Sequence, residues 1–134
     1  MFAKKSDKPQ NRIDSLIGAG TRVEGDVVFA GGLRVDGEIK GNVSAAQGEN
    51  GTLVVSEQAR IEGEIRCARL VVNGTVAGTV HVTDAVELHP RSKVTGDIHY
   101  GRVEMHLGAI VEGRLVHSAT EARTTVELKL AKGG

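Results

Sequence analysis

The feature that most constrains this chain is a short motif of aliphatic residues and glycine that recurs along most of its length. Its skeleton is an aliphatic residue or Met, three variable positions, a small residue, another variable position, and then Val/Ile-x-Gly-x-Val/Ile/Leu. Full copies occupy residues 17–27, 55–65, 88–98 and 105–115. Shorter copies at 33–39 and 70–76 each continue into a second Gly-x-Val. Repetition at this scale identifies a repeat protein, in which each unit buries its apolar face against its neighbours.

Within each copy, apolar and polar residues alternate as they do along a β-strand. In the segment 23–27, Val23 and Val27 share one face with the glycine between them, while Glu24 and Asp26 share the other. Branched aliphatic residues dominate the apolar content, and Phe and Tyr together number only three. Such side chains pack well on pleated strands. The pattern predicts an all-β fold.

Corners between such short strands fit a coil whose strands pair with the rungs before and after them. We predict a single-domain, right-handed parallel β-helix of about six rungs, because the glycine motifs are too unevenly spaced for the strict six-residue phase of left-handed hexapeptide helices. A protruding turn is expected at 46–52, where glycine and asparagine are concentrated. The predicted rungs are 17–32, 33–52, 53–69, 70–85, 86–102 and 103–118. They make up a domain at 16–118, between a disordered arm at 1–15 and a flexible tail at 119–134. The alternating residues 126–130 leave open a cap on the last rung.

Composition and motifs argue against several classes of function. The net charge is zero, Cys67 is the single cysteine, and no run of 18 apolar residues occurs. These features predict a cytoplasmic protein without a disulfide, a membrane span or a nucleic-acid partner. No nucleotide loop or Ser/His/Asp arrangement stands out, so we expect no catalysis and no cofactor. We also expect no metal site, because the histidines lack ligand spacing on one rung. They are His81, His89, His99, His106 and His117.

Outward-facing charges suggest two ladders along the rod. We expect an acidic ladder from Glu24/Asp26, Asp36/Glu38 and Glu62/Glu64, beside a basic ladder from Arg22, Arg34, Arg60 and Lys93. A solvated face with ion pairs and a docking surface for a partner both fit this pattern.

The two ends of such a rod expose an unpaired strand edge and a slice of aliphatic core. The first and last rungs contain no polar capping segment, so we predict that like ends stack into filaments, unless the tails fold over them. The predicted polymer-interface residues are Ile17, Val23, Val27, Leu107, Ile110, Val111, Leu115 and Val116.

The beginning of the arm combines bulky apolar residues with lysines. This tip fits a solvated tail, and it also fits a weak membrane-surface anchor in which each lysine contributes roughly 1 kcal/mol. The candidate membrane-binding residues are Met1, Phe2, Lys4, Lys5 and Lys8. Many copies on one polymer would strengthen such binding through avidity.

The tandem Val/Ile-x-Gly-x-Val/Ile units over about residues 16–117, with polar tails and the start Met-Phe-Ala-Lys-Lys, resemble the bactofilin family. The resemblance implies a right-handed β-helix that polymerises end to end into non-polar filaments without nucleotide. It also implies a bacterial cytoskeletal scaffold, peripheral on the inner face of the cytoplasmic membrane, that recruits cell-wall or morphogenesis proteins. The family's polymer contacts are apolar residues of the terminal rungs. Leu115 and Val116 stand here in place of the phenylalanine that the family often has near the C-terminal end of its core.

The alternative from another class is a hexapeptide-repeat β-helix enzyme, similar to an acyltransferase and acting as a trimer. Such an enzyme needs a regular six-residue phase and a catalytic histidine in a protruding loop, and the predicted loop at 46–52 contains no histidine.

Overall fold

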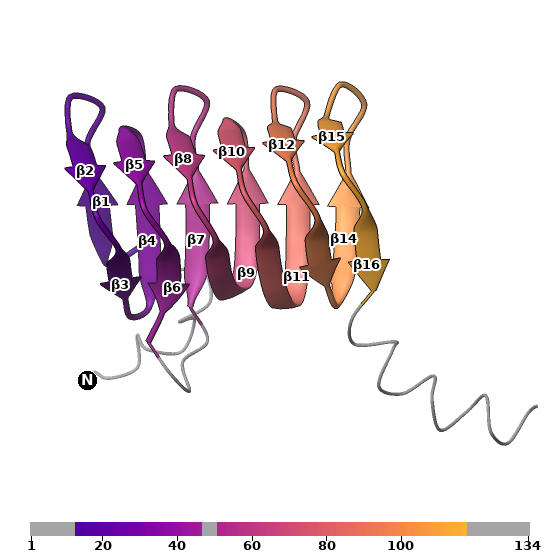
Figure 1. The fold of residues 1–134 in the computed structure, drawn as a ribbon, viewed down its shortest axis with the longest axis horizontal. Coiled ribbons are helices and arrows are strands. Elements are labelled where there is room, and N and C mark those ends of the chain that lie inside the picture. Colours follow the sequence, from indigo (N-terminus) through magenta and orange to yellow (C-terminus); the bar gives the residue numbers. More distant parts are fainter. Residues whose placement is uncertain (1–12, 47–50, 118–134) are drawn as a thin grey trace, which may run out of the picture.

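The structure is a computed structural model that describes residues 13–46 and 51–117. Within these residues all regular structure is β, and parallel strands coil into a rod of about six rungs (Figure 1). The predicted single-domain parallel β-helix is therefore confirmed. Most contacts join residues far apart in sequence, because each strand pairs with the strands one rung before and one rung after it.

The strands stack in three columns, which we call A, B and C in the order in which the chain enters them. Column A holds β1 (Ser15–Ile17), β4 (Gly32–Val35), β7 (Thr52–Val55), the second halves of β9 (Ile65–Val72) and β11 (Val80–Leu88), and β14 (Arg102–Met105). Column B holds β2 (Arg22–Glu24), β5 (Glu38–Lys40), β8 (Arg60–Glu62), β10 (Thr75–Ala77), β12 (Lys93–Thr95) and β15 (Ile110–Glu112). Column C holds β3 (Val27–Phe29), β6 (Val43–Ala45), the first halves of β9 and β11, β13 (Ile98–Tyr100) and β16 (Leu115–His117).

The core lies inside this three-sided coil and consists of the inward residue of each strand position. In column B, Ile39, Ile61, Val76 and Val94 lie in register on successive rungs and are fully buried. In column A, Leu33, Leu53 and Leu70 stack in the same way. The predicted starts of rungs 2 to 6 fall in register with one another, but Ser15 pairs with Leu33. Rung 1 therefore begins two residues earlier than the expected start at residue 17.

A glycine ladder turns the chain between columns B and C. Its members have φ between 133° and 159°, and a Cβ on each one after Gly25 would overlap the carbonyl oxygen of the glycine one rung earlier. The ladder consists of Gly25, Gly41, Gly63, Gly78, Gly96 and Gly113. The counterpart of Gly25 on rung 2 is thus Gly41, in the second Gly-x-Val of the short copy. Gly37 belongs to a different corner.

The corner between columns A and B has two forms. On rungs 1, 3, 5 and 6 it is a wide corner that projects as a four-residue loop, closed by a backbone hydrogen bond of 2.9–3.0 Å between its first and last residues. These loops are 18–21, 56–59, 89–92 and 106–109. On rungs 2 and 4 it is a tight corner at Gly37 or Gly74, where a Cβ would overlap carbonyl oxygens of the preceding wide corner. Figure 1 shows the wide corners projecting along one edge of the rod.

The corner between columns C and A carries the predicted insertion. Val43 pairs with Ile65 and Thr52 pairs with Arg69. The chain therefore advances nine residues from Val43 to Thr52 but only four from Ile65 to Arg69 at the same corner one rung later. The extra length falls at the predicted turn, whose residues 47–50 lie outside the described residues.

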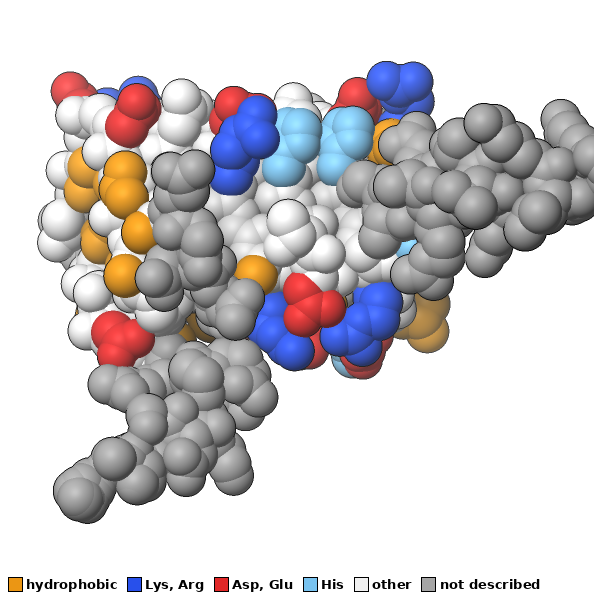
Figure 2. All heavy atoms as spheres, turned by 90° about the horizontal axis from the view of Figure 1, so that it is seen from below, with side chains coloured by type: hydrophobic (Ala, Val, Ile, Leu, Met, Phe, Trp, Pro, Cys, Tyr) orange, Lys and Arg blue, Asp and Glu red, His pale blue; other side chains and the backbone are white. Residues whose placement is uncertain are grey.

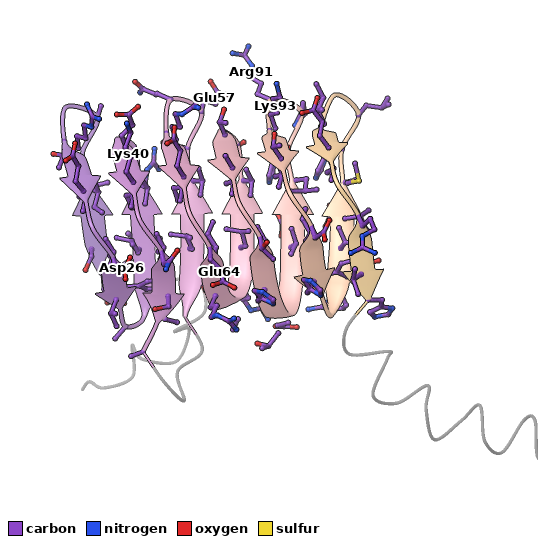
Figure 3. The ribbon with its side chains drawn as sticks, viewed as in Figure 1. Asp26, Lys40, Glu57, Glu64, Arg91 and Lys93 are labelled. Carbon is purple, nitrogen blue, oxygen red and sulfur yellow. The ribbon has the colours of Figure 1, made fainter. Side chains whose placement is uncertain are left out.

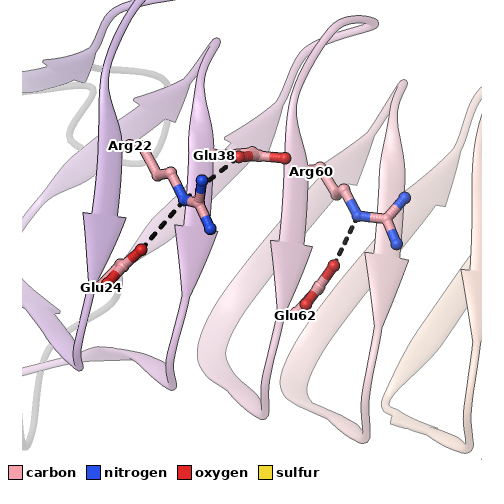
Figure 4. A network of polar contacts seen from close by, with 5 residues as sticks. All are labelled: Arg22, Glu24, Glu38, Arg60 and Glu62. Carbon is pink, nitrogen blue, oxygen red and sulfur yellow. Dashed lines mark hydrogen bonds and ion pairs between the residues drawn. The ribbon is translucent and has the colours of Figure 1, made fainter.

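The predicted ladders of like charge are wrong. Register places Arg22 beside Glu38 and Glu38 beside Arg60, while Glu24, Lys40 and Glu62 form a second alternating row. The prediction aligned Gly37 with Gly25, whereas in the structure Gly41 stacks on Gly25. This alignment places Glu38 beside Arg22 and Lys40 beside Glu24. Ion pairs join Arg22 to Glu24 at 3.2 Å, Arg22 to Glu38 at 3.7 Å and Arg60 to Glu62 at 2.7 Å (Figure 4). The hydrogen bond from Arg60 lowers the pKa of the Glu62 carboxyl.

Candidate self-association surfaces at the two ends

The rod ends in strands that pair on one side only within the described residues. At the N-terminal end these are β1, β2 and β3, and at the C-terminal end they are β14, β15 and β16. Each end therefore presents three short strand edges around a slice of core. Such edges are templates for pairing with another chain.

Among the described residues, the large exposed hydrophobic side chains lie at these two ends. Every large hydrophobic residue that is exposed in the described structure lies on the first or last rung, or just before the first. They are Ile13, Leu16, Val28, Met105, Leu107, Ile110 and Leu115. Figure 2, which views the rod from below, shows apolar side chains gathered toward the N-terminal end of that face. Patches of this kind mark interaction sites on soluble proteins.

At the N-terminal end, the three predicted residues face inward. Ile17, Val23 and Val27 lie in register with buried residues of rung 2 and pack against the core from one side. Leu16 and Val28 were missed by the sequence analysis because they alternate with inward residues and face outward from the rod. Their polar or smaller counterparts on rung 2 are Arg34 and Ser44, which would have revealed them.

At the C-terminal end, the five predicted residues occupy three different positions. Val111 and Leu115 face inward in register with Val94 and Ile98, and they form the open slice of core. Ile110 and Val116 take outward positions on the side of the last rung. Leu107 lies in the last wide corner and is 96% exposed.

Two further residues complete the C-terminal slice, and the sequence analysis missed both. Val103 and Met105 lie in register with Val86 and Leu88 on column A. Met105 is the first residue of a motif copy, as Ile17 is. Its inward position could therefore have been predicted by comparison with Ile17. The slice at this end thus combines Val103, Met105, Val111 and Leu115.

The histidines form stacked pairs between neighbouring rungs. His81 stacks on His99 with ring centroids 4.7 Å apart, and His89 stacks on His106 at 4.8 Å. His117 stacks on Tyr100 at 5.1 Å. Pale blue side chains lie side by side on the face in Figure 2. Among residues 13–46 and 51–117, no group of three or more His, Cys, Asp or Glu residues is placed to hold a metal ion.

The side chains of His81 and Cys67 have shifted pKa values. Burial, the nearby Arg66 guanidinium and His99 lower the pKa of His81, and the Glu64 carboxylate 3.0 Å from its Nε2 opposes that shift. Burial raises the pKa of the Cys67 thiol to about 12. Cys67 is therefore a structural residue of low reactivity.

The candidate membrane-binding residues lie outside the described residues. In the part of the chain that is described, no helix has the length and apolar character needed to cross a bilayer.

By its geometry the chain is a parallel β-solenoid, whose terminal rungs leave strand edges and apolar side chains exposed within the described residues. Comparison with protein families shows that residues 15–116 match the family Bactofilin, described as polymer-forming cytoskeletal. The match covers most of the chain, which therefore belongs to the bactofilin family. The resemblance found in the sequence is confirmed.

Two curated relatives come from Myxococcus xanthus (strain DK1622). Bactofilin BacP is 26% identical over 113 residues, which cover 84% of this chain and 45% of BacP. Bactofilin BacO is 26% identical over 102 residues, which cover 76% of this chain and 78% of BacO. The chain thus spans less than half the length of BacP. No solved structure matches the chain.

Proposed function

We propose that this protein is a cytoskeletal scaffold that assembles end to end into filaments without nucleotide. The observation that carries the proposal is that, among the described residues, the exposed large hydrophobic side chains lie on the two terminal rungs or just before the first. Membership in a polymer-forming family supports the same reading. Stacking of two rods would bury the open slices of core and pair the free strand edges, which supplies the driving force without a bound nucleotide.

The proposed contacts join like ends. The N-terminal slice contains Ile17, Val23 and Val27, and the C-terminal slice contains Leu115 with Val111, so each end is apolar and can meet its own copy about a two-fold axis. Alternation of the two contacts along a filament gives a polymer without direction. Ile110, Val116 and Leu107 border the C-terminal slice and would line the rim of that contact.

Negative-stain electron microscopy in plain buffer tests the proposal. Wild-type protein should form filaments, and Leu115→Arg should abolish them because a charge would enter the buried contact. The matched control is Val71→Arg, which places arginine at an outward position of a central rung beside Glu87. The control should keep its filaments. Filaments that survive Leu115→Arg would place the interface elsewhere, and discrete trimers would support the enzyme reading.

The proposed site of action is the inner face of the cytoplasmic membrane. Met1 and Phe2 would insert between headgroups while Lys4, Lys5 and Lys8 meet anionic lipid. Deletion of residues 1–8 should release the protein from anionic liposomes in a co-sedimentation assay while filaments persist. Unchanged co-sedimentation would contradict the anchor. On the membrane, the filaments would recruit cell-wall or morphogenesis proteins.

A further inference from the structure

The alternation of wide and tight corners leaves gaps in the row of loops along one edge of the rod. Wide corners on rungs 1 and 3 flank the tight corner of rung 2, and those on rungs 3 and 5 flank that of rung 4. Successive rungs are about 4.8 Å apart, so one missing loop leaves a gap about one polypeptide chain thick. We call the gap over Gly37 the first notch and the gap over Gly74 the second notch.

The first notch is an open hollow. It has a volume of about 270 Å³ and is lined by the first loop, the third rung's Gln58, and Arg22, Gly37 and Glu38. The loop on one side of it, residues 18–21, carries no charged side chain. The second notch differs, because Glu57 and Arg91 reach toward each other across it and form an ion pair of 3.5 Å. Figure 3 shows both side chains at the edge formed by the wide corners.

Rungs 5 and 6 show what a filled gap looks like. Both have wide corners, so their loops are direct neighbours. His89 stacks on His106, and Gly108 lies against Pro90. Two loops of this shape therefore pack side by side at the spacing of one rung. A loop from another molecule would meet the same dimensions in the first notch.

We propose that the first notch receives the 56–59 loop of a second copy of this chain, which pairs filaments side by side. The loop and the notch lie on adjacent rungs, so a two-fold axis between rungs 2 and 3 makes both insertions at once. Glu38 also lines the notch and pairs with Arg22 at 3.7 Å, and the inserted loop would bring Glu57 to the same arginine. Glu57 and Arg22 are both more than half exposed, and the ion pairs they make within one chain are at the surface and readily exchanged.

A single insertion buries little surface, so the contact is weak between isolated chains. Repetition along a filament multiplies it, and in this respect the inference rests on the proposed function. The lateral contact uses the edge of the rod and the polymer contact uses its ends, so the two can be disrupted separately.

The first test fills the notch from within the chain. Replacement of Asp36 and Gly37 by Ser-Glu-Gln-Ala gives rung 2 the corner of rung 3, and rungs 5 and 6 indicate that neighbouring wide corners are compatible with the fold. By electron microscopy, wild-type filaments should lie in side-by-side pairs and the graft should give single filaments of the same length. Pairs that persist in the graft would overturn the inference.

The second test reverses charges and leaves the corner lengths unchanged. Glu57→Arg or Arg22→Glu alone should separate paired filaments, and the two together should restore pairing. Lys93→Glu, which changes the equivalent position on rung 5, away from the first notch, is the matched control and should keep the pairs. If the double variant stays single, the assigned contact is wrong.

The outcomes separate the two proposals. Single wild-type filaments would overturn the lateral contact and leave the end-to-end scaffold intact. Two-chain particles that depend on Glu57 and Arg22, without filaments, would support the lateral contact and contradict the scaffold. Particles that remain single chains at all concentrations in sedimentation velocity would overturn both.

Discussion

The central and terminal rungs share one motif and differ in what covers it. Ile98 on rung 5 is fully buried, whereas Leu115, at the same position on rung 6, is 41% exposed. Ile61 on rung 3 is fully buried, and Val111 on rung 6 is only partly buried. In a solenoid each side chain is covered by the rungs on both sides, and a terminal rung has one of them. The same residue type is therefore buried core in the middle and partly exposed apolar surface at the ends.

In the proposed end-to-end filament, assembly would continue the core of the single molecule. A stacked copy would supply the missing rung and cover the terminal side chains as the central ones are covered. The sequence then needs no special interface motif. It needs only an ordinary rung without a cap.

The largest expected effect breaks the central core. Leu53→Ala removes a fully buried side chain between Leu33 and Leu70, and we expect it to lower the free energy of unfolding by about 2–5 kcal/mol. Leu115→Ala should cost less than about 1 kcal/mol in an unassembled background, because that side chain is already partly in water. Urea denaturation of both variants measures the contrast. Equal losses would show that the terminal rung is as well covered as the centre.

A smaller effect concerns the glycine ladder. Gly63→Ala would bring a Cβ into the backbone of Gly41 at a φ of 154°. We expect it to lower the free energy of unfolding by about 1–3 kcal/mol. Gly20→Ala, in the first wide corner, meets nothing within 4 Å and should change stability little. Thermal unfolding by circular dichroism compares them. A neutral Gly63→Ala would show that the ladder tolerates side chains.

Two glycines of rung 2, Gly37 and Gly41, show what the sequence could and could not reveal. The repeat, the strands and the core residues were predictable because Val/Ile-x-Gly-x-Val has a single inward face. The sequence did not distinguish the roles of Gly37 and Gly41. Both belong to one short copy, and each follows an aliphatic residue and a charged residue (Val-Asp-Gly and Ile-Lys-Gly). Only pairing between rungs shows that Gly41 stacks on Gly25. The charge ladders were wrong for the same reason.

The candidate contact residues were predictable in part. Residues of the terminal rungs were found because an open end follows from the repeat itself. Which of them face inward depends on the register with the neighbouring rung, and this separates Leu115 from Val116 and Val111 from Ile110. The first notch could not be predicted, because it depends on the placement of wide and tight corners in space.

The smallest expected effect is a pH dependence that lies in the central part of the rod. Because burial and then Arg66 lower the pKa of His81 in the folded state, the unfolded chain binds a proton first as the pH falls below about 6.5. Folding stability is then lost between pH 6.5 and the lower pKa of the folded state. His81→Gln should flatten this part of the stability curve, and Arg66→Gln should flatten it partly by removing the positive charge. Denaturation midpoints at pH 7.5, 6.5 and 5.5 measure the slope. The loss of stability that follows protonation of carboxylates such as Glu62 occurs at more acidic pH and is a separate effect. An unchanged slope in His81→Gln would mean that another group governs stability there, and the stacked histidines would then be packing residues on the side of the rod.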